Sequence, residues 1–352
     1  MAFVQTPPLH SDAEVLADWW EISALTHEFS EIGLSSLIGR TDSGEARARE
    51  SEDLGKDADN TSSQIIAEIS SRSDALEASY PFSISDNGEI LTFDAPTEIG
   101  GQLYLLCLGF SHPNSSILLS EPFLEGLIRA DPRRLLFESI SAIGVAGFIQ
   151  GNAKILGTSI LSDDPDEVDL KKRKIIRFQE MIYNLVGDGT PLGRIPPGVS
   201  TMTKDAGIDI IAWKKTNRGD PPHAQYIIAQ VASGENWKTK SAKSAEKEWH
   251  KAWFNPSPIT PANCLTAMPF CFVPDIPTEP MYSREENVKA YRGLMLERHG
   301  QVLSRKLLPH YAKLGQELHA QGGFEIDGID RIPELETWSR EFIAQAKTRA
   351  AA

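Results

Sequence analysis

The sequence predicts an α/β fold, in which helices flank a mixed sheet and an N-terminal α+β module and C-terminal helices are added to this core. Three observations carry the prediction. The stretch 204–240 contains two apolar runs on either side of a polar, Pro-containing segment, which is typical of two antiparallel strands. Helical patterns precede and follow it, at 121–150 and 241–254. A further apolar stretch, 265–274, is expected to add a strand, because helices that alternate with strands indicate an α/β arrangement.

The chain has 352 residues, which suggests two domains or one domain with large additions. We divide it into an N-terminal α+β module (1–120), the core (121–280) and a C-terminal helical extension (281–352). The composition, 41% hydrophobic and 24% charged, is that of a soluble globular protein. Because no apolar run is long enough to span a membrane and the N-terminus lacks the pattern of a signal peptide, we expect a cytoplasmic protein with no membrane partner.

Charge and cysteine content exclude further classes. The net charge of −14 disfavours a protein that coats nucleic acid by charge alone, although basic residues can gather locally. Cys107, Cys264 and Cys271 lie in apolar surroundings without CxxC spacing. A zinc site and a disulfide framework are therefore not expected, and reduced thiols are the simple interpretation.

The N-terminal module is expected to begin with a helix. Ser11 and Glu14 form a capping-box pattern, in which the side chains at the start of the helix bond its first backbone groups. The polar stretch 41–63 is either a mobile loop or the exposed start of a second helix, which the pattern of Ile65–Ser73 predicts.

A hairpin is expected next. Pro81–Phe93 alternates apolar and polar residues around Asn87 and Gly88, a pair that favours a type I′ turn. The apolar run Gln102–Phe110 follows, and periodicity does not decide whether it is a strand or a buried helix.

In the core, Asp131 and Pro132 suit the N-cap and the first position of a helix. Glu138 is an acid in the otherwise apolar or small part of this helix. A short strand is expected over Lys154–Leu161, and an amphipathic helix over Leu170–Val186.

The C-terminal extension is expected to be helical. Ser283 and Glu286 form a second capping box, and Gly300 and Pro309 break the helical stretch that follows. A last helix is expected over 333–352. The basic residues of the broken stretch either face DNA phosphate or form a solvated charged face, and the second interpretation is preferred; they are Arg292, Arg298, Arg305 and Lys306.

Two polar residues interrupt the apolar runs of the central hairpin, Asp209 in the first and Gln230 in the second. Burying a charge is unfavourable unless it is paired or bound to a metal, so a carboxylate among Ile residues indicates a function. Antiparallel pairing can bring the two side chains together. A carboxylate and an amide oxygen on neighbouring strands suit Mg²⁺, and an acid from a nearby helix would complete the site.

The order of these motifs resembles the restriction-endonuclease-like superfamily, also called PD-(D/E)xK nucleases. The resemblance covers about 125–275 and rests on Phe137-Glu138, Asp205-Ala206-Gly207-Ile208-Asp209 and Gln230-Val231-Ala232. It implies a restriction-endonuclease-like core in which Glu138, Asp209 and Gln230 bind Mg²⁺ or Mn²⁺. It also implies hydrolysis of phosphodiester bonds, for which the metal lowers the pKa of a bound water.

The chain departs from this pattern at Ala232, where the superfamily has a lysine that orients the attacking water. The lysine sometimes comes from another position. Lys238 is therefore assigned as its replacement among the catalytic residues, with Lys214 and Lys240 as weaker candidates.

Other residues have competing interpretations. Glu180 competes with Glu138 for the helix position, although a water-facing place suits it better. Asp205 is either a second acid of the metal site or a turn residue. Surface positions are expected for four histidines, His223, His250, His299 and His310. Four tryptophans are expected to pack in the protein and not to stack on bases: Trp213, Trp237, Trp249 and Trp253.

We therefore expect a metal-dependent DNA endonuclease of a prokaryotic defence or restriction system, with a partner protein of that system. The defence context comes from segment 230–240, which is similar to a recurring segment of bacterial proteins in this superfamily. Ala232 and the acidic net charge favour the alternative, a catalytically inactive module of the nuclease fold that binds nucleic acid or a partner protein. A third hypothesis is an interaction protein whose C-terminal helices mediate assembly, and homo-oligomers are left open.

Overall fold

The computed structural model describes most of the chain. The described residues are 7, 12–35, 51–111, 131–156, 179–180, 183–184, 189–194, 207–214, 225–258, 260–271 and 282–351. None of the helices among these residues combines the length and the apolar character that a membrane span needs.

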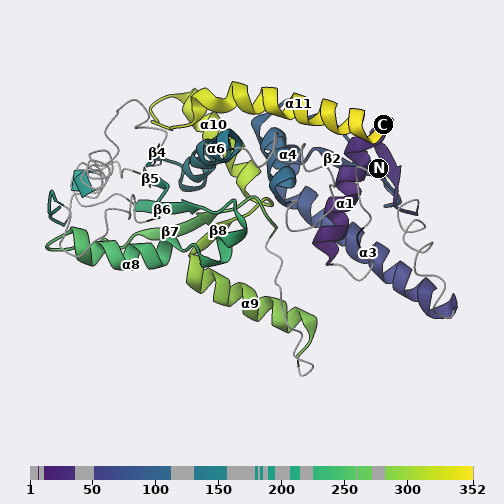
Figure 1. The fold of residues 1–352 in the computed structure, drawn as a ribbon, viewed down its shortest axis with the longest axis horizontal. Helices are drawn as coiled ribbons and strands as arrows, with labels where there is room; N and C mark the ends of the chain where they lie inside the picture. The colour runs from purple at the N-terminus through teal and green to yellow at the C-terminus, as the bar shows by residue number, and fades with distance from the viewer. Residues whose placement is uncertain are drawn as a thin grey trace.

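A mixed five-stranded sheet forms the centre of the larger part of the molecule (Figure 1). Its strands are β4 (Asn152–Ile155), β5 (Ile210–Lys214), β6 (Gln225–Val231), β7 (Asn263–Ala267) and β8 (Gln301–Leu303), in that spatial order. The first three pair antiparallel, whereas β6, β7 and β8 run parallel. The predicted α/β class, with a mixed sheet flanked by helices, is confirmed.

The hairpin strands β5 and β6 are apolar at nearly every position because helices cover both faces of the sheet. Ile210 and Ala229 belong to the main core, together with residues of α6 (Asp131–Ile149). Ile211 and Ile228 pack on the opposite face with residues of α8 (Ala242–Trp253). Strands that are buried on both faces have continuous apolar sequences, which is why the two strands of this hairpin could be predicted.

Helix α10 (Leu308–Gln321) crosses α6 at very short range (Figure 1). A Cβ atom on Gly147 would lie 2.0 Å from the carbonyl oxygen of Tyr311, and one on Gly315 would lie 2.1 Å from that of Ile143. The two helix backbones can approach this closely only because glycine stands at both positions.

In the N-terminal part, helices pack around a small antiparallel sheet of order β1-β3-β2. The apolar run 102–110 is a helix and not a strand, and it is buried along its whole length because neighbouring helices and the small sheet enclose it. The elements are α1 (Ala13–Thr26), β1 (Glu31–Gly33), α3 (Ser51–Leu76), η1 (Glu77–Ser79), β2 (Phe82–Ile84), β3 (Ile90–Phe93) and α4 (Ile99–Ser111), and α11 (Ile332–Ala351) lies against α1 and α4.

The predicted hairpin between β2 and β3 is confirmed, but its turn is not type I′. Only Gly88 has a positive φ, whereas a type I′ turn needs positive φ at both central residues. The amide of Gly88 donates to the carbonyl of Ser85, and the Ser85 hydroxyl accepts from the amide of Ile90. Hydrogen bonds from the side chains of Ser85 and Asn87 therefore stabilise a connection between β2 and β3 that is longer than a two-residue turn.

The C-terminal extension contributes a strand as well as helices. The capping box of Ser283 and Glu286 begins α9 (Arg284–His299), as predicted, and Gly300 ends it at φ 75°. The chain then enters the central sheet as β8, which the helical interpretation of this stretch missed. Pro309 lies in the first turn of α10, where its missing N–H is harmless, so it begins a helix and does not break one.

Several expected boundaries move. β4 begins two residues before Lys154, β7 lies over 263–267 and not 265–274, and the part of 41–63 that is described, from Ser51 onward, is helical. Ser11, residues 41–50 and 157–161, and most of 170–186 lie outside the described residues.

Candidate functional site

Asp209 lies at the start of β5, where the chain leaves regular strand geometry. Its N–H donates to the carbonyl of Ala229 in β6, whereas its carbonyl accepts from Leu156, which follows β4. In a regular antiparallel ladder the N–H and the C=O of one residue bond to the same neighbouring strand. At Asp209 they bond to opposite neighbours, so the chain twists there. Its side-chain Oδ2 accepts a hydrogen bond of 2.6 Å from the amide of Val231. Asp209 therefore bonds both neighbours of Gln230.

Gln230 is 8% exposed, and its side chain belongs to the face of β6 that α8 covers. Its Oε1 atom is buried and has no hydrogen-bond partner among the described residues. Its Nε2 atom lies against Gly207, where a Cβ atom would come within 3.1 Å and where φ is +77°. Glycine is thus favoured at 207 both by the backbone conformation and by the position of the Gln230 amide.

The lysine that bonds this strand end is Lys240, whereas Lys238, the lysine assigned from the sequence, lies over Trp237. Lys240 Nζ donates a 3.0 Å hydrogen bond to the carbonyl oxygen of Val231. Lys238 is exposed, and its ammonium lies over the Trp237 ring, 5.9 Å from the centroid. Both lysines belong to the segment after β6. Lys238 lies in the short helix η5 (Glu235–Thr239) and Lys240 is the residue that follows it, so their side chains point in different directions.

Glu138 lies on α6, which packs against β5 and β6, and its Oε1 atom is buried. Among the described residues, no three His, Cys, Asp or Glu side chains gather closely enough to hold a metal ion. The predicted ligand set contains only two such side chains, because its third member is an amide. Asp205 lies outside the described residues, and Glu180 is exposed, as expected.

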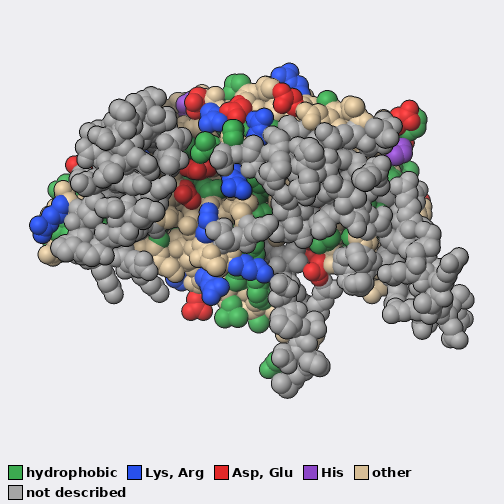
Figure 2. All heavy atoms as spheres, viewed as in Figure 1, with side chains coloured by type: hydrophobic (Ala, Val, Ile, Leu, Met, Phe, Trp, Pro, Cys, Tyr) green, Lys and Arg blue, Asp and Glu red, His purple; other side chains and the backbone are tan. Residues whose placement is uncertain are grey.

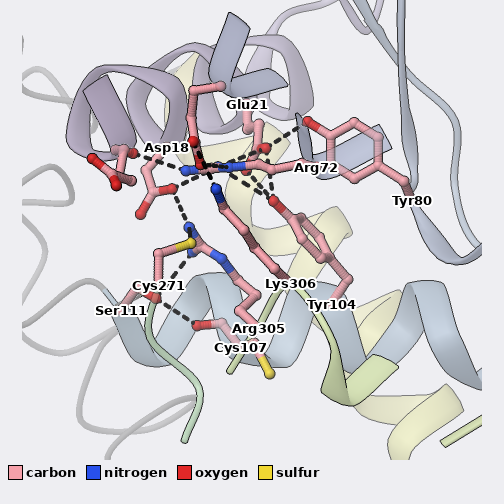
Figure 3. Close-up of polar contacts among 12 residues, drawn as sticks. Asp18, Glu21, Arg72, Tyr80, Tyr104, Cys107, Ser111, Cys271, Arg305 and Lys306 are labelled. Carbon is pink, nitrogen blue, oxygen red and sulfur yellow. Dashed lines mark hydrogen bonds and ion pairs between the residues drawn. The ribbon is translucent and has the colours of Figure 1, made fainter. Parts of the chain in front are cut away.

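A second polar cluster lies where the N-terminal helices meet the sheet (Figure 3). Arg72 bonds Asp18 and Glu21 of α1, each at 2.8 Å, and the hydroxyls of Tyr80 and Tyr104 donate to Glu21 at 2.6 and 2.7 Å. We call this group, with Arg305, Lys306 and Glu68, the buried ionic cluster.

Arg305 connects this cluster to the sheet. It follows β8, is 0% exposed, and donates to Asp18, to the Ser111 hydroxyl and to Cys271 Sγ. Lys306 donates to Glu68 at 2.7 Å. The expected solvated face is therefore wrong for Arg305, whose charge is neutralised inside the protein.

The buried ionic cluster shifts the pKa of its carboxyl groups. Burial alone would raise the pKa of Asp18, but attraction to Arg305 and Arg72 outweighs burial and holds it below its ordinary value. The pKa of Glu68 is lowered against burial by Arg72 and Lys306 in the same way. Burial raises the pKa of both tyrosines, which therefore remain neutral hydrogen-bond donors.

The cluster and the candidate site lie at the same edge of the sheet. Parallel strands end at one edge, so the ends of β7 and β8, which carry Cys271 and Arg305, lie beside the end of β6, which carries Gln230 and Val231. Figure 2 shows Lys and Arg side chains in the middle of this face, over the ends of β6 and β8. Residues 12–35 and 51–111 thus flank the site, a role that their sequence did not reveal.

Two groups at this edge were missed from the sequence, His299 and the charges of α1, and Lys240, which contacts Val231, was ranked below Lys238. His299, expected at the surface, is 0% exposed. The charges of α1 do have a signal in the sequence, since Asp18 and Glu21 interrupt an apolar helix as Asp209 interrupts a strand. The three cysteines are free and buried, and the described tryptophans pack in the core, as predicted.

Compared with known proteins, the chain matches no family model, no curated sequence and no solved structure.

Proposed function

We propose that the chain is a metal-dependent nuclease that hydrolyses phosphodiester bonds in DNA at the edge where Asp209, Gln230 and Lys240 meet. The observation that carries the proposal is the contact set around Val231. A carboxylate, a buried amide oxygen without a hydrogen-bond partner in the described part of the chain, and a lysine amine converge on one end of one strand. The order of helix acid, strand acid and strand amide adds support through the resemblance to restriction-endonuclease-like proteins.

The donor set fits a hard divalent cation such as Mg²⁺ or Mn²⁺. Asp209 and Gln230 would supply the strand ligands, and Glu138, from the helix on the face of β6 opposite to the Gln230 side chain, would have to complete the set around the strand end, all through oxygen. The unsatisfied Oε1 of Gln230 supports this fit, because a buried acceptor without a donor is unfavourable unless something else binds it. When bound, the metal would generate the attacking hydroxide and stabilise negative charge on the phosphate.

Lys240 would take the role that the superfamily assigns to the missing motif lysine. Ala232 occupies that position and is 0% exposed in a cluster with Trp237 and Met268, so no longer side chain fits there. The Lys240 amine reaches the same strand end from the following segment. From there a short rotation of the side chain would turn its positive charge to a phosphate oxygen.

The test is cleavage of supercoiled plasmid DNA with Mg²⁺ or Mn²⁺, compared with the Asp209→Asn variant. This variant keeps an oxygen that can accept from the Val231 amide, so the fold is expected to survive. Cleavage by the wild type that is lost in Asp209→Asn and in EDTA supports the proposal. Equal cleavage by both proteins would rule out Asp209 as a ligand.

One observation favours the second candidate, a catalytically inactive module of the same fold that binds nucleic acid or a partner protein. Asp209 Oδ2 and Lys240 Nζ both bond the backbone of Val231, and such bonds also suit a purely structural role. This candidate predicts that Mg²⁺ or Mn²⁺ leaves the melting temperature unchanged. A metal-dependent rise in Tm that disappears in Asp209→Asn counts against it.

A further inference from the structure

His299, the last residue of α9, is enclosed beside the candidate site. It is 0% exposed, and both ring nitrogens are buried without a hydrogen-bond partner among the described residues. A neutral imidazole has one donor and one acceptor, so neither group makes a hydrogen bond of regular geometry, although the backbone of Lys240 lies close enough to the ring to raise its pKa. Such groups are rare in folded proteins and indicate either a function or a bound water or ion.

Contacts on one side connect His299 to Gln230. Thr266 pairs with Gln230 in the ladder between β6 and β7, and its hydroxyl donates to the carbonyl of His299 at 3.1 Å. The next residue, Gly300, packs so tightly on β7 that a Cβ atom would lie 2.2 Å from the carbonyl oxygen of Cys264. The end of α9 is therefore fixed relative to the strand beside Gln230.

Contacts on the other side connect His299 to the segment that carries Lys240. The His299 and Trp237 rings lie 5.9 Å apart. Arg298 donates to the carbonyl of Lys238, and the Ser241 hydroxyl donates to the carbonyl of Arg298. The end of α9 thus supports η5 and the residues that follow it.

We propose that His299 is a positioning residue that holds the segment after β6 in register, so that the Lys240 amine stays at the Val231 carbonyl beside Asp209 and Gln230. The role of this geometry in catalysis rests on the proposed nuclease function, whereas the geometry itself does not. A leucine would fill the space, but it would lose the interaction of the ring with the backbone of Lys240 that raises the pKa of His299 against burial.

The surroundings of the ring make the arrangement sensitive to pH. The neighbouring groups that act on the ring are the charge of Arg298, on α9, and the backbone of Lys240, in the segment after β6. Arg298 is positive, so protonating the ring would place a second positive charge beside it in a buried place. Burial lowers the pKa of His299, Arg298 lowers it further, and the backbone of Lys240 acts in the opposite direction. The ring is therefore neutral at pH 7 and gains a proton only in acid.

The experiment measures how fast trace acetylation modifies Lys240 relative to Lys238 in the full-length protein, by peptide mass spectrometry. In the wild type Lys240 is expected to react at least about tenfold more slowly, because its amine is bonded and half-buried. In His299→Leu the ratio of the Lys240 rate to the Lys238 rate is expected to approach one, and in His299→Gln the protection is expected to recover in part. Lowering the pH from 7 to 5 should raise this ratio in the wild type, because a ring whose pKa lies below 6.5 gains its proton in that range, and should leave it unchanged in His299→Leu.

Met295→Ala is the matched control, because it removes a buried side chain from the same region without touching the imidazole. An unchanged ratio in His299→Leu, or an equal rise in Met295→Ala, would overturn the positioning role. The measurement uses no nuclease activity. If Lys240 is protected by His299 but plasmid DNA is not cleaved, the positioning role stands and the proposed function fails.

Discussion

Asp209 and Lys240 bind the two backbone groups of a single residue, Val231. The Asp209 carboxylate accepts from its amide at 2.6 Å, and the Lys240 amine donates to its carbonyl at 3.0 Å. Because both groups of a strand residue point to the same side, the carboxylate and the amine lie on the side of β6 from which β5 comes. Their opposite charges are thus held near each other at the open end of the hairpin, next to Gln230.

Asp209 has a structural role in addition to its proposed chemical one. Asp209→Ala leaves the buried amide of Val231 without its acceptor, which we expect to lower the free energy of unfolding by about 1–3 kcal/mol. Asp209→Asn retains an acceptor and should lower it by less than about 1 kcal/mol. Urea denaturation in EDTA measures both. Equal losses in the two variants would show that the charge, and not the hydrogen bond, stabilises this turn.

The two lysines of the segment after β6 should behave differently. Lys240→Met is expected to reduce cleavage by about 10²–10³-fold, the usual effect of removing one group that stabilises developing charge. Lys238→Met should change cleavage by less than about threefold, because that side chain is exposed over Trp237. Initial rates on the same plasmid decide between them. The reverse order would restore the sequence-based assignment of Lys238.

Gln230 should reveal a conflict between stability and function. Replacing its amide with an apolar side chain of similar size removes a buried unsatisfied oxygen, so Gln230→Met is expected to raise the free energy of unfolding by about 1 kcal/mol in EDTA. The same variant should lose any increase in Tm caused by Mg²⁺. Thr266→Val is the control, because it removes a satisfied hydrogen bond from the neighbouring strand and should destabilise the protein. Destabilisation by Gln230→Met would mean that its amide has a partner.

The buried ionic cluster should be sensitive to removal of a single partner. Arg305→Met leaves the buried Asp18 paired with Arg72 but removes one positive charge from the cluster, and it is expected to lower the free energy of unfolding by about 3–5 kcal/mol. Lys313→Met, which breaks the surface pair of Lys313 with Glu98, should lower it by no more than about 1 kcal/mol. Thermal or urea unfolding measures both. Similar small losses would show that the N-terminal part does not depend on the cluster for its attachment.

Acid should weaken the same cluster. The pKa values of Asp18 and Glu68 are lower in the folded state than in the unfolded chain, so their contribution is present above about pH 4.5 and is lost as the pH falls. Glu14 acts in the opposite direction, because burial raises its pKa, but it is one group against two. Unfolding by urea at pH 3.5–7 should show the decrease, and Glu68→Gln should make it shallower. A slope unchanged by Glu68→Gln would assign the acid effect to other groups.

Elements whose signals are local could be predicted from the amino-acid sequence alone. The capping box at Ser283, the apolar strands on either side of Asp209 and Gln230, and the α/β class follow from periodicity and from bonds between residues a few positions apart. The proximity of Asp209 to Gln230 also followed, because a hairpin leaves few possible registers. The type of the 102–110 run did not, since an apolar run suits a buried helix and a buried strand equally.

Which charged residues meet depends instead on the tertiary fold. Arg305 looked like a surface residue in the sequence, but β8 places it against α1, which precedes it by nearly the whole chain. His299 looked ordinary, but α9 ends against the sheet, and Lys240 replaces Lys238 because η5 turns one toward Val231 and the other toward Trp237. Such contacts depend on how distant segments pack, and no local preference encodes them. At the end of β6, the acid and the amide were therefore predictable from local pattern, whereas the lysine was placed by the packing of η5.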